Sequence, residues 1–320
     1  MPLPDLLQGR LQLPVVAAPM FLASGPDLVL ACCRAGIVGT FPALNQRTTE
    51  GFASWLETLN SSLGAAEAPF GVNLIVHRTN PRLQADLEMV IRHRVPVVIT
   101  SLGAVRDVID KVHAYGGVVF HDVTTVRHAR KAAESGVDGL ILVAAGAGGH
   151  AGTINPFALL WEVRQFFTGT LLLAGALSTG EQIAAARLLG ADLAYMGTRF
   201  IATHECAVEP SYKDMVVDSA AEDIVYTPAI SGIPANFMRP SLVAAGLDPD
   251  RLPVDHGAGL KDIGSEVKAW KTVWSAGQGV SCIQDIPTVS ELVARLSKEY
   301  DQALGQAGDL RMKACCLPNS

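Results

Sequence analysis

The sequence has few aromatic residues and no excess of positive charge. Phe, Trp and Tyr make up 6% of its 320 residues, and 25 Lys and Arg side chains stand against 31 Asp and Glu, for a net charge of −6. A nucleic acid is held by a basic surface and by rings that stack on its bases. Because this chain has little of either, we expect no nucleic-acid partner.

The chain also lacks metal-binding cysteine patterns and membrane-length apolar runs. Its six cysteines contain no Cys-x-x-Cys pair, which fits a reducing cytoplasm. The opening residues MPLPDLLQGRLQLP show neither the basic start nor the apolar run of an export signal, and no later run is long enough to cross a bilayer. We expect a cytoplasmic protein with no membrane partner.

What the sequence does contain is a regular series of short apolar runs separated by amphipathic segments. The runs are continuous rather than alternating, as in parallel strands covered by helices on the outside. Eight strand–helix units predict an α/β fold, a (β/α)₈ TIM barrel, rather than a doubly wound sheet. The runs are PVVAA at 14, GIVGT at 36, FGVNLIV at 70, PVVIT at 96, GVVFH at 117, GLILV at 139, TLLLA at 170 and DLAYM at 192.

The pattern changes after the eighth run. Prolines accumulate from Pro210 to Pro253 without clean strand–helix alternation, whereas 265–274 and 288–304 are again helical in pattern. We therefore expect three parts: a barrel at 1–206, a smaller, mostly helical cap at 207–264, and C-terminal helices at 265–320 that return to the barrel.

Two glycine-containing turns follow the seventh and eighth runs. Active sites of such barrels lie at the carboxyl ends of the strands, and the last two loops often hold a phosphate with backbone N–H groups. Gly175 and Ala176 in AGALSTG, with Gly197 and Thr198 in MGTRF, predict a phosphate site. The alternative for each loop alone is an ordinary tight turn.

The stretch VAAGAGGHAG, at 143–152, places a histidine in a glycine-rich loop after the sixth run. Gly146, Gly148 and Ala151 match a dinucleotide fingerprint in form, but that motif follows the first strand of a doubly wound sheet. A loop histidine often only donates to a carbonyl. At a barrel mouth, with glycines that admit a ligand, His150 is suited to remove a proton from a carbon acid.

His121 and Asp122, after the fifth run, allow two interpretations. With His150 they have the residue types of a metal site. Metal-dependent barrel hydrolases usually supply paired histidines from the first strand, and VVAAPMFLAS has none. We therefore favour a supporting role in which His121 and Asp122 orient groups that bind the ligand.

Taken together, these stretches resemble the nitronate monooxygenase family of FMN-dependent barrels. PVVAAPM, PFGVNL, GAGGHAG, GADLAYMGTRFIAT and WSAGQGV match in order along the barrel. The resemblance implies FMN as cofactor and His150 as catalytic base, with FMN phosphate at Gly175, Ala176, Gly197 and Thr198. It implies further contacts with the flavin or its surroundings at Pro19, Met20, Asn73, Gly148, Gly149, Gln278 and Gly279.

Two positions depart from the pattern of the family. Asp122 stands where some relatives carry a lysine, and AGA replaces a double glycine at 175–176. The first departure changes the charge expected near the flavin. The second preserves phosphate binding only if the backbone needs no positive φ at Ala176, because alanine keeps its N–H.

The resulting hypothesis is FMN-dependent oxidation of alkyl nitronates, or of nitroalkanes, with O₂. His150 then acts either as a base or as a hydrogen-bond donor that steers an anion. The alternatives are an FMN-dependent NAD(P)H:quinone oxidoreductase and, more remotely, a metal-dependent barrel hydrolase. A homodimer is compatible with the sequence, which does not determine the oligomeric state.

Overall fold

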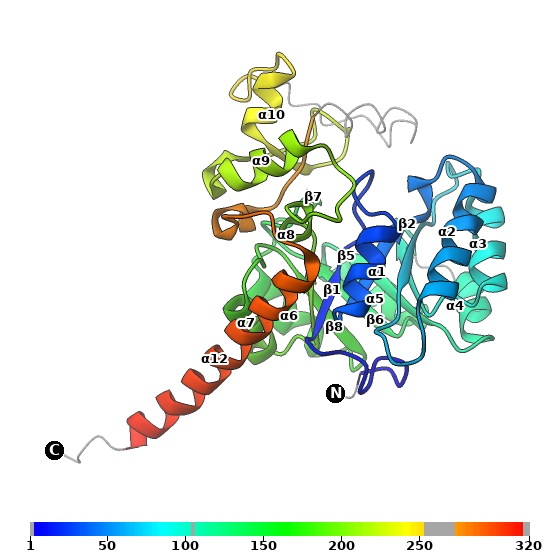
Figure 1. Cartoon of the computed structure of the whole chain (residues 1–320), viewed down its shortest axis with the longest axis horizontal. Coiled ribbons are helices and arrows are strands. Elements are labelled where there is room, and N and C mark those ends of the chain that lie inside the picture. Colours follow the sequence, from blue (N-terminus) through cyan, green and yellow to red (C-terminus); the bar gives the residue numbers. More distant parts are fainter. Residues whose placement is uncertain (1–2, 104–105, 253–272, 316–320) are drawn as a thin grey trace.

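A computed structural model describes the backbone of residues 3–103, 106–252 and 273–315, with side chains to residue 308. Eight parallel strands close into a barrel in the order β1-β2-β3-β4-β5-β6-β8-β9, and β9 pairs with β1 (Figure 1). The predicted TIM barrel is confirmed, with every predicted run forming a strand. The strands are β1 (Val15–Ala17), β2 (Val38–Pro42), β3 (Gly71–Ile75), β4 (Val97–Ser101), β5 (Val118–Val123), β6 (Gly139–Val143), β8 (Thr170–Ala174) and β9 (Leu193–Met196).

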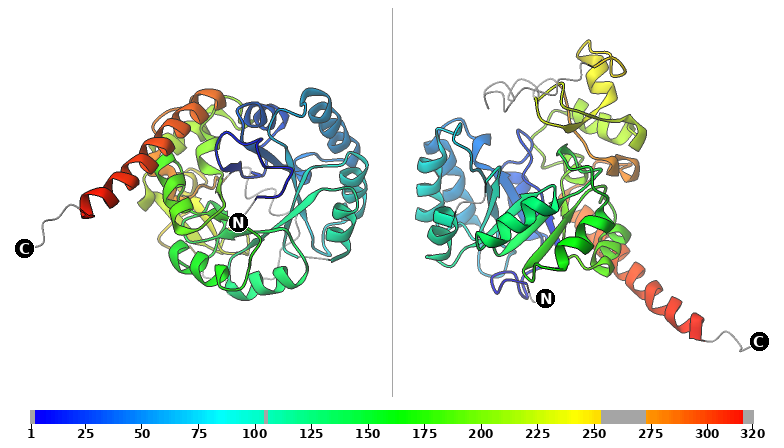
Figure 2. Two further views of the ribbon diagram at one scale, coloured as in Figure 1. Left: turned by 90° about the horizontal axis from the view of Figure 1, so that it is seen from below. Right: turned by 180° about the vertical axis from the view of Figure 1, so that it is seen from behind.

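Helices surround the barrel on the outside (Figure 2). Side-chain oxygens of Thr125 and Thr179 cap two of them, and Gly190 ends one in the left-handed conformation. These helices are α1 (Pro26–Arg34), α2 (Thr49–Ser62), α3 (Leu83–Arg92), α4 (Arg106–His113), α5 (Val126–Glu134), α6 (Pro156–Arg164), α7 (Gly180–Leu189) and α8 (Thr198–Ile201), with a 3₁₀ turn η1 (Ala43–Asn45).

Strand alternation divides the buried side chains of the barrel strands between the interior of the barrel and the side that faces the helices. Val97 and Ile99 of β4 belong to the cluster inside the barrel, whereas Val98 belongs to the cluster against the helices. Leu7 also joins the interior cluster. Because residues two apart share a face, Asn73, Ser101 and Asp122 continue the inward-facing rows of their strands.

The cap contains a β-hairpin in addition to helices. It comprises α9 (Pro210–Asp218), η2 (Ala221–Asp223), β10 (Ile224–Thr227), β11 (Ala235–Met238) and α10 (Arg239–Ala244). β11 pairs antiparallel with β10 and with β7 (Gly149–His150), which comes from the loop after β6. The predicted end of the cap and the start of the predicted helix at 265–274 lie outside the described residues. The division at 206 and 264 stays a prediction.

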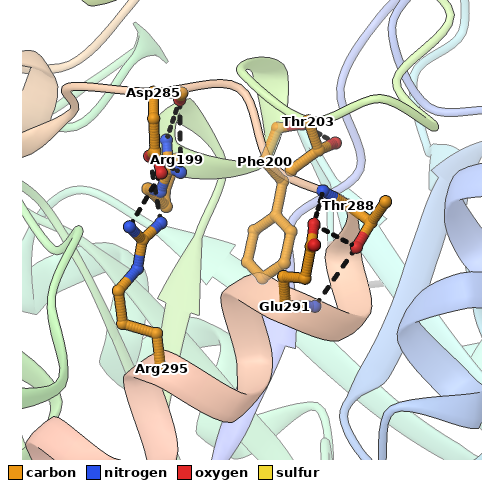
Figure 3. Close-up of polar contacts among 7 residues, drawn as sticks. All are labelled: Arg199, Phe200, Thr203, Asp285, Thr288, Glu291 and Arg295. Atoms are coloured by element: carbon orange, nitrogen blue, oxygen red, sulfur yellow. Dashed lines mark hydrogen bonds and ion pairs between the residues drawn. The ribbon is translucent and has the colours of Figure 1, made fainter.

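The chain after the cap runs through η3 (Gln278–Cys282) into α12 (Val289–Cys315), which lies against α7 and α1 before extending away from the barrel (Figure 1). Arg199 of α8 is 2% exposed, and its Nη2 lies 2.9 Å from Asp285 Oδ1. Arg295 Nη1 of α12 lies 2.8 Å from the other carboxylate oxygen of Asp285 (Figure 3). Thr288 and Glu291 cap the start of α12. Among the described residues no helix is long and apolar enough to cross a membrane.

Candidate active site at the barrel mouth

A cavity of about 880 Å³ lies at the carboxyl ends of the barrel strands and under the cap. It brings together nearly all residues that the sequence analysis selected from separate strands. Gln278 is the exception among them: its backbone N donates to Gly146 O at 2.9 Å, but it is not a lining residue. The selected residues that line the cavity are Pro19, Met20, Asn73, His121, Asp122, Gly148, Gly149, His150, Gly175, Ala176, Gly197, Thr198 and Gly279.

One side of the cavity consists of three turns that we call the glycine loops, residues 146–149, 175–176 and 197–198. A Cβ on Gly148 would lie 2.9 Å from Gly277 N, and one on Gly175 would lie 2.8 Å from Ala145 O. Gly277 N also donates to Thr198 Oγ1 at 2.9 Å. Two of the glycine loops, 146–149 and 197–198, are therefore closely packed against the segment before η3, and residues of all three loops border the cavity.

Ala176 departs from ordinary backbone geometry in these loops. Its φ is +54°, in the left-handed region that costs a non-glycine residue roughly 1–2 kcal/mol. The backbone therefore does need positive φ at this position, contrary to the condition under which the sequence analysis accepted alanine. Alanine keeps its backbone N–H, so alanine in place of glycine at this position adds backbone strain but does not remove a hydrogen-bond donor.

A buried hydroxyl next to the glycine loops fits an anionic ligand. Ser178 is 2% exposed, and its Oγ has no hydrogen-bond partner among the described residues. This Oγ is 2.5 Å from the point where a Cβ on Gly279 would stand. An unmet donor is costly to bury, so a phosphate in these loops would fit both the missing side chains and the free hydroxyl.

His150 is positioned by the cap. It lies in β7, where it pairs with Ala235 of β11, and Gly149 N donates to Ser275 Oγ at 2.8 Å. Asn236 Nδ2 donates to Ala147 O at 2.6 Å. Burial lowers the pKa of His150 from 6.5 to about 4, so the ring is neutral at neutral pH.

These supporting residues were not found from the sequence. Asn236 and Tyr226 lie in a hairpin whose partner strand is only two residues long, Gly149 and His150. Tyr226 Oη donates to Ala151 O at 3.0 Å and so contacts the far end of the histidine loop. A two-residue strand has no detectable periodicity, so this pairing leaves no signal in the sequence.

The opposite side of the cavity carries three hydrogen-bonded side chains that we call the polar row: Asn73 of β3, Ser101 of β4 and Asp122 of β5. Asn73 Nδ2 donates to Ser101 Oγ at 2.7 Å, and Ser101 Oγ donates to Asp122 Oδ2 at 2.5 Å. Burial raises the pKa of Asp122 to about 6, and the Ser101 hydrogen bond opposes this rise. Tyr195 of β9 lines the same cavity.

His121 and Asp122 point to opposite sides of β5. His121 Nδ1 lies 2.8 Å from Thr100 Oγ1, on the helix-facing side of the strand, although His121 still borders the cavity. Burial lowers the pKa of His121 to about 4. Among the described residues no three His, Cys, Asp or Glu side chains are grouped as a metal would require.

Comparison with known proteins bears on this geometry. The sequence profile described as nitronate monooxygenase matches residues 5–299. The chain belongs to this family. It is 26% identical to a nitronate monooxygenase of Paraburkholderia phytofirmans, over 92% of this chain and 93% of the relative. The family assignment confirms the resemblance predicted from the sequence and makes the protein an oxidoreductase.

Two further relatives show the range of activities named among similar proteins. A nitroalkane oxidase structure from Streptomyces ansochromogenes superposes with a TM-score of 0.81 at 25% identity, over 95% of this chain and all of the other. The (3aS,4S,5R,7aS)-5-hydroxy-7a-methyl-1-oxo-octahydro-1H-indene-4-carboxyl-CoA dehydrogenase of Mycobacterium tuberculosis is 30% identical, over 76% of this chain and 67% of the relative. Similar barrels thus carry more than one activity.

Proposed function

We propose that this protein oxidises alkyl nitronates with O₂ in an FMN-dependent reaction and that His150 binds the anionic substrate. The observation that carries the proposal is the position of His150. Pairing of β7 with β11 holds it over a cavity that the glycine loops border on one side. Membership of the nitronate monooxygenase family supports the reaction class.

The residues present fit FMN. Gly175, Ala176, Gly197 and Thr198 would hold the phosphate with backbone groups, and the free hydroxyl of Ser178 lies beside them. Met20 borders the cavity next to Gly197, and a Cβ on that glycine would come within 3.6 Å of its Sδ. When bound, the flavin supplies the electron transfer, while the chain binds and orients the substrate.

The protonation state of His150 favours the role of donor. A neutral imidazole carries one N–H that can donate to a nitronate oxygen. With a pKa near 4, the same ring is a weak acceptor for the α proton of a neutral nitroalkane. We therefore infer that the substrate arrives as the nitronate anion and that His150 orients it.

Two substitutions separate the donor and base roles. His150→Asn keeps a hydrogen-bond donor but removes the base, whereas His150→Phe removes both. We expect His150→Asn to keep most nitronate turnover and His150→Phe to lose about a hundredfold in kcat/KM, as for an oxyanion-binding donor. Equal, large losses in both variants would contradict the donor role, and a selective loss on neutral nitroalkanes in both would establish the base.

The alternative function, an NAD(P)H:quinone oxidoreductase, is tested on the same purified protein. Anaerobic bleaching of the flavin by NADH, within one turnover time and without bleaching by a nitronate, would support that function and contradict ours. A colourless protein that loses activity with a chelator would instead support the metal-dependent hydrolase. The visible spectrum reports the flavin and its bleaching, and an activity assay with and without chelator tests the metal.

A further inference from the structure

We propose that Asp122, held by Ser101 and Asn73, is an acid that in its protonated form donates a hydrogen bond to the flavin ring and that its protonation state sets how readily the flavin is reduced. The proposal rests on the FMN-dependent function proposed above. It gives the polar row a role in positioning the flavin and in setting its reduction potential, whereas the proposed function assigns the polar row no role.

The hydrogen bonds of the polar row leave Asp122 with little compensation for a charge. Asn73 Nδ2 donates to Ser101 Oγ, so the hydroxyl proton of Ser101 is directed to Asp122 Oδ2. Among the described residues no cation forms an ion pair with Asp122. A buried carboxylate with one hydroxyl donor and no cation is stabilised by keeping its proton.

The position of the polar row indicates which part of a bound flavin the Asp122 carboxyl would contact. The glycine loops follow β6, β8 and β9, whereas the row ends β3, β4 and β5, and both border one cavity. A ligand anchored by its phosphate in the glycine loops would extend its ring across the mouth toward the row. The pyrimidine edge of a flavin has oxygen and nitrogen acceptors, and a protonated carboxyl is a donor.

Tyr195 and His150 also face this cavity, but they change charge at pH values different from that of Asp122. Tyr195 of β9 stays neutral because burial and Asp122 raise its pKa well above its usual value. His150 of β7 is neutral above its pKa of about 4. Asp122, with a pKa of about 6, is the acid that changes charge in between. His128 and Lys131 of α5 also line the cavity, so His128 needs its own control.

The expected consequence is a pH-dependent potential. Reduction of a flavin by two electrons adds negative charge unless protons follow, and an ionised Asp122 would oppose that charge. A protonated Asp122 would stabilise it and would not repel a nitronate. The flavin should therefore be easier to reduce below the pKa of Asp122 than above it.

The first experiment measures the midpoint potential of the bound flavin from about pH 5 to about pH 8, on both sides of the Asp122 pKa of about 6. Above this pKa the midpoint potential of the wild type should fall more steeply with pH than that of Asp122→Asn. The extra fall should correspond to a change of about tenfold in the equilibrium constant for flavin reduction. His128→Asn should behave as the wild type. Superimposable profiles for wild type and Asp122→Asn would overturn the proposal.

A second experiment follows the carboxyl itself. In ¹³C-aspartate-labelled, flavin-free protein, the resonance that Asp122→Asn removes should titrate near pH 6. In Ser101→Ala it should titrate higher, because that hydrogen bond lowers the pKa. Titration near the ordinary value of about 3.9 would overturn the proposal. A protein that binds no flavin would overturn the proposed function and the ring contact together, whereas identical redox profiles in loaded proteins would overturn the role of Asp122 alone.

Discussion

The two sides of the barrel mouth differ in which groups they present to the cavity. The glycine loops expose backbone: side chains are missing at Gly148 and Gly175, and a Cβ would meet main-chain atoms there. The polar row exposes side chains, which are tied to one another by hydrogen bonds of 2.7 and 2.5 Å. One side leaves room for a ligand to approach the backbone closely, and the other presents polar side chains that can donate or accept hydrogen bonds.

This difference indicates how each side tolerates change. A substitution of a glycine in the glycine loops adds atoms where none fit, so its main effect should be on ligand binding. A substitution in the polar row exchanges one functional group for another, so its effect should be on protonation. The predictions below test this division, beginning with the largest effect.

Gly175→Asp should abolish flavin binding. The new side chain would meet Ala145 O at 2.8 Å, at a φ of +136°, and would place a carboxylate where a phosphate is proposed. The measurement is flavin absorbance per mole of purified, folded protein. Gly175→Ala is the matched control for the steric part, and we expect it to retain more flavin. A fully loaded, yellow Gly175→Asp protein would contradict the phosphate placement.

Arg199→Ala should destabilise the protein by about 3 kcal/mol, because truncation of a large, fully buried side chain leaves a cavity and removes its hydrogen bonds to Asp285, which stays paired with Arg295. Arg199 is 2% exposed and ties α8, directly after the third glycine loop, to the segment before α12. Arg295→Ala, which removes the exposed partner of the same carboxylate, should cost less than about 1 kcal/mol. The free energies of unfolding of both variants in urea show whether loss of the buried arginine costs more than loss of the exposed one.

Asp122→Asn should raise the free energy of unfolding by about 3 kcal/mol at pH 8 and by little at pH 3. The folded pKa of about 6 lies above the value of 3.8 for an unburied group, so folding binds a proton between these values and stability falls as pH rises through them. An asparagine removes that loss. Urea unfolding at both pH values provides the test, and equal changes at both would show that no ionisation is involved.

Ala176→Gly should stabilise the protein by up to about 1 kcal/mol, since relief of left-handed strain exceeds the entropy cost of glycine. Ala147→Gly, in a neighbouring loop and without a positive φ, should instead destabilise by about 0.5–1 kcal/mol. Thermal unfolding of the pair isolates the backbone effect. A loss of stability at Ala176→Gly would mean that the methyl group contributes packing that outweighs the strain.

Much of the barrel could be predicted because its signals are local. Each apolar run is a strand, and Thr125 and Thr179 cap the helices that follow two of them. The hairpin of the cap could not be predicted, because β11 is completed by a two-residue strand from the loop after β6. That pairing depends on the closed barrel bringing the loop and the cap together.

That the candidate residues meet at one cavity could also be predicted from local signals. The rule that strand ends meet at one mouth collected His150, Asn73 and Asp122 from three strands. It could not give the register that places Ser101 beside Asp122, which follows from the pairing of Thr100 with His121. It also could not give the left-handed backbone of Ala176, which is set by packing between loops.

Nitronate oxidation by a bound flavin is tested most directly by anaerobic titration of the purified protein with an alkyl nitronate while its visible spectrum is recorded. We expect a yellow protein whose flavin is bleached by the nitronate within one turnover time and recovers its colour when O₂ is admitted. A colourless protein, or a yellow one bleached by NADH and unchanged by the nitronate, would contradict it.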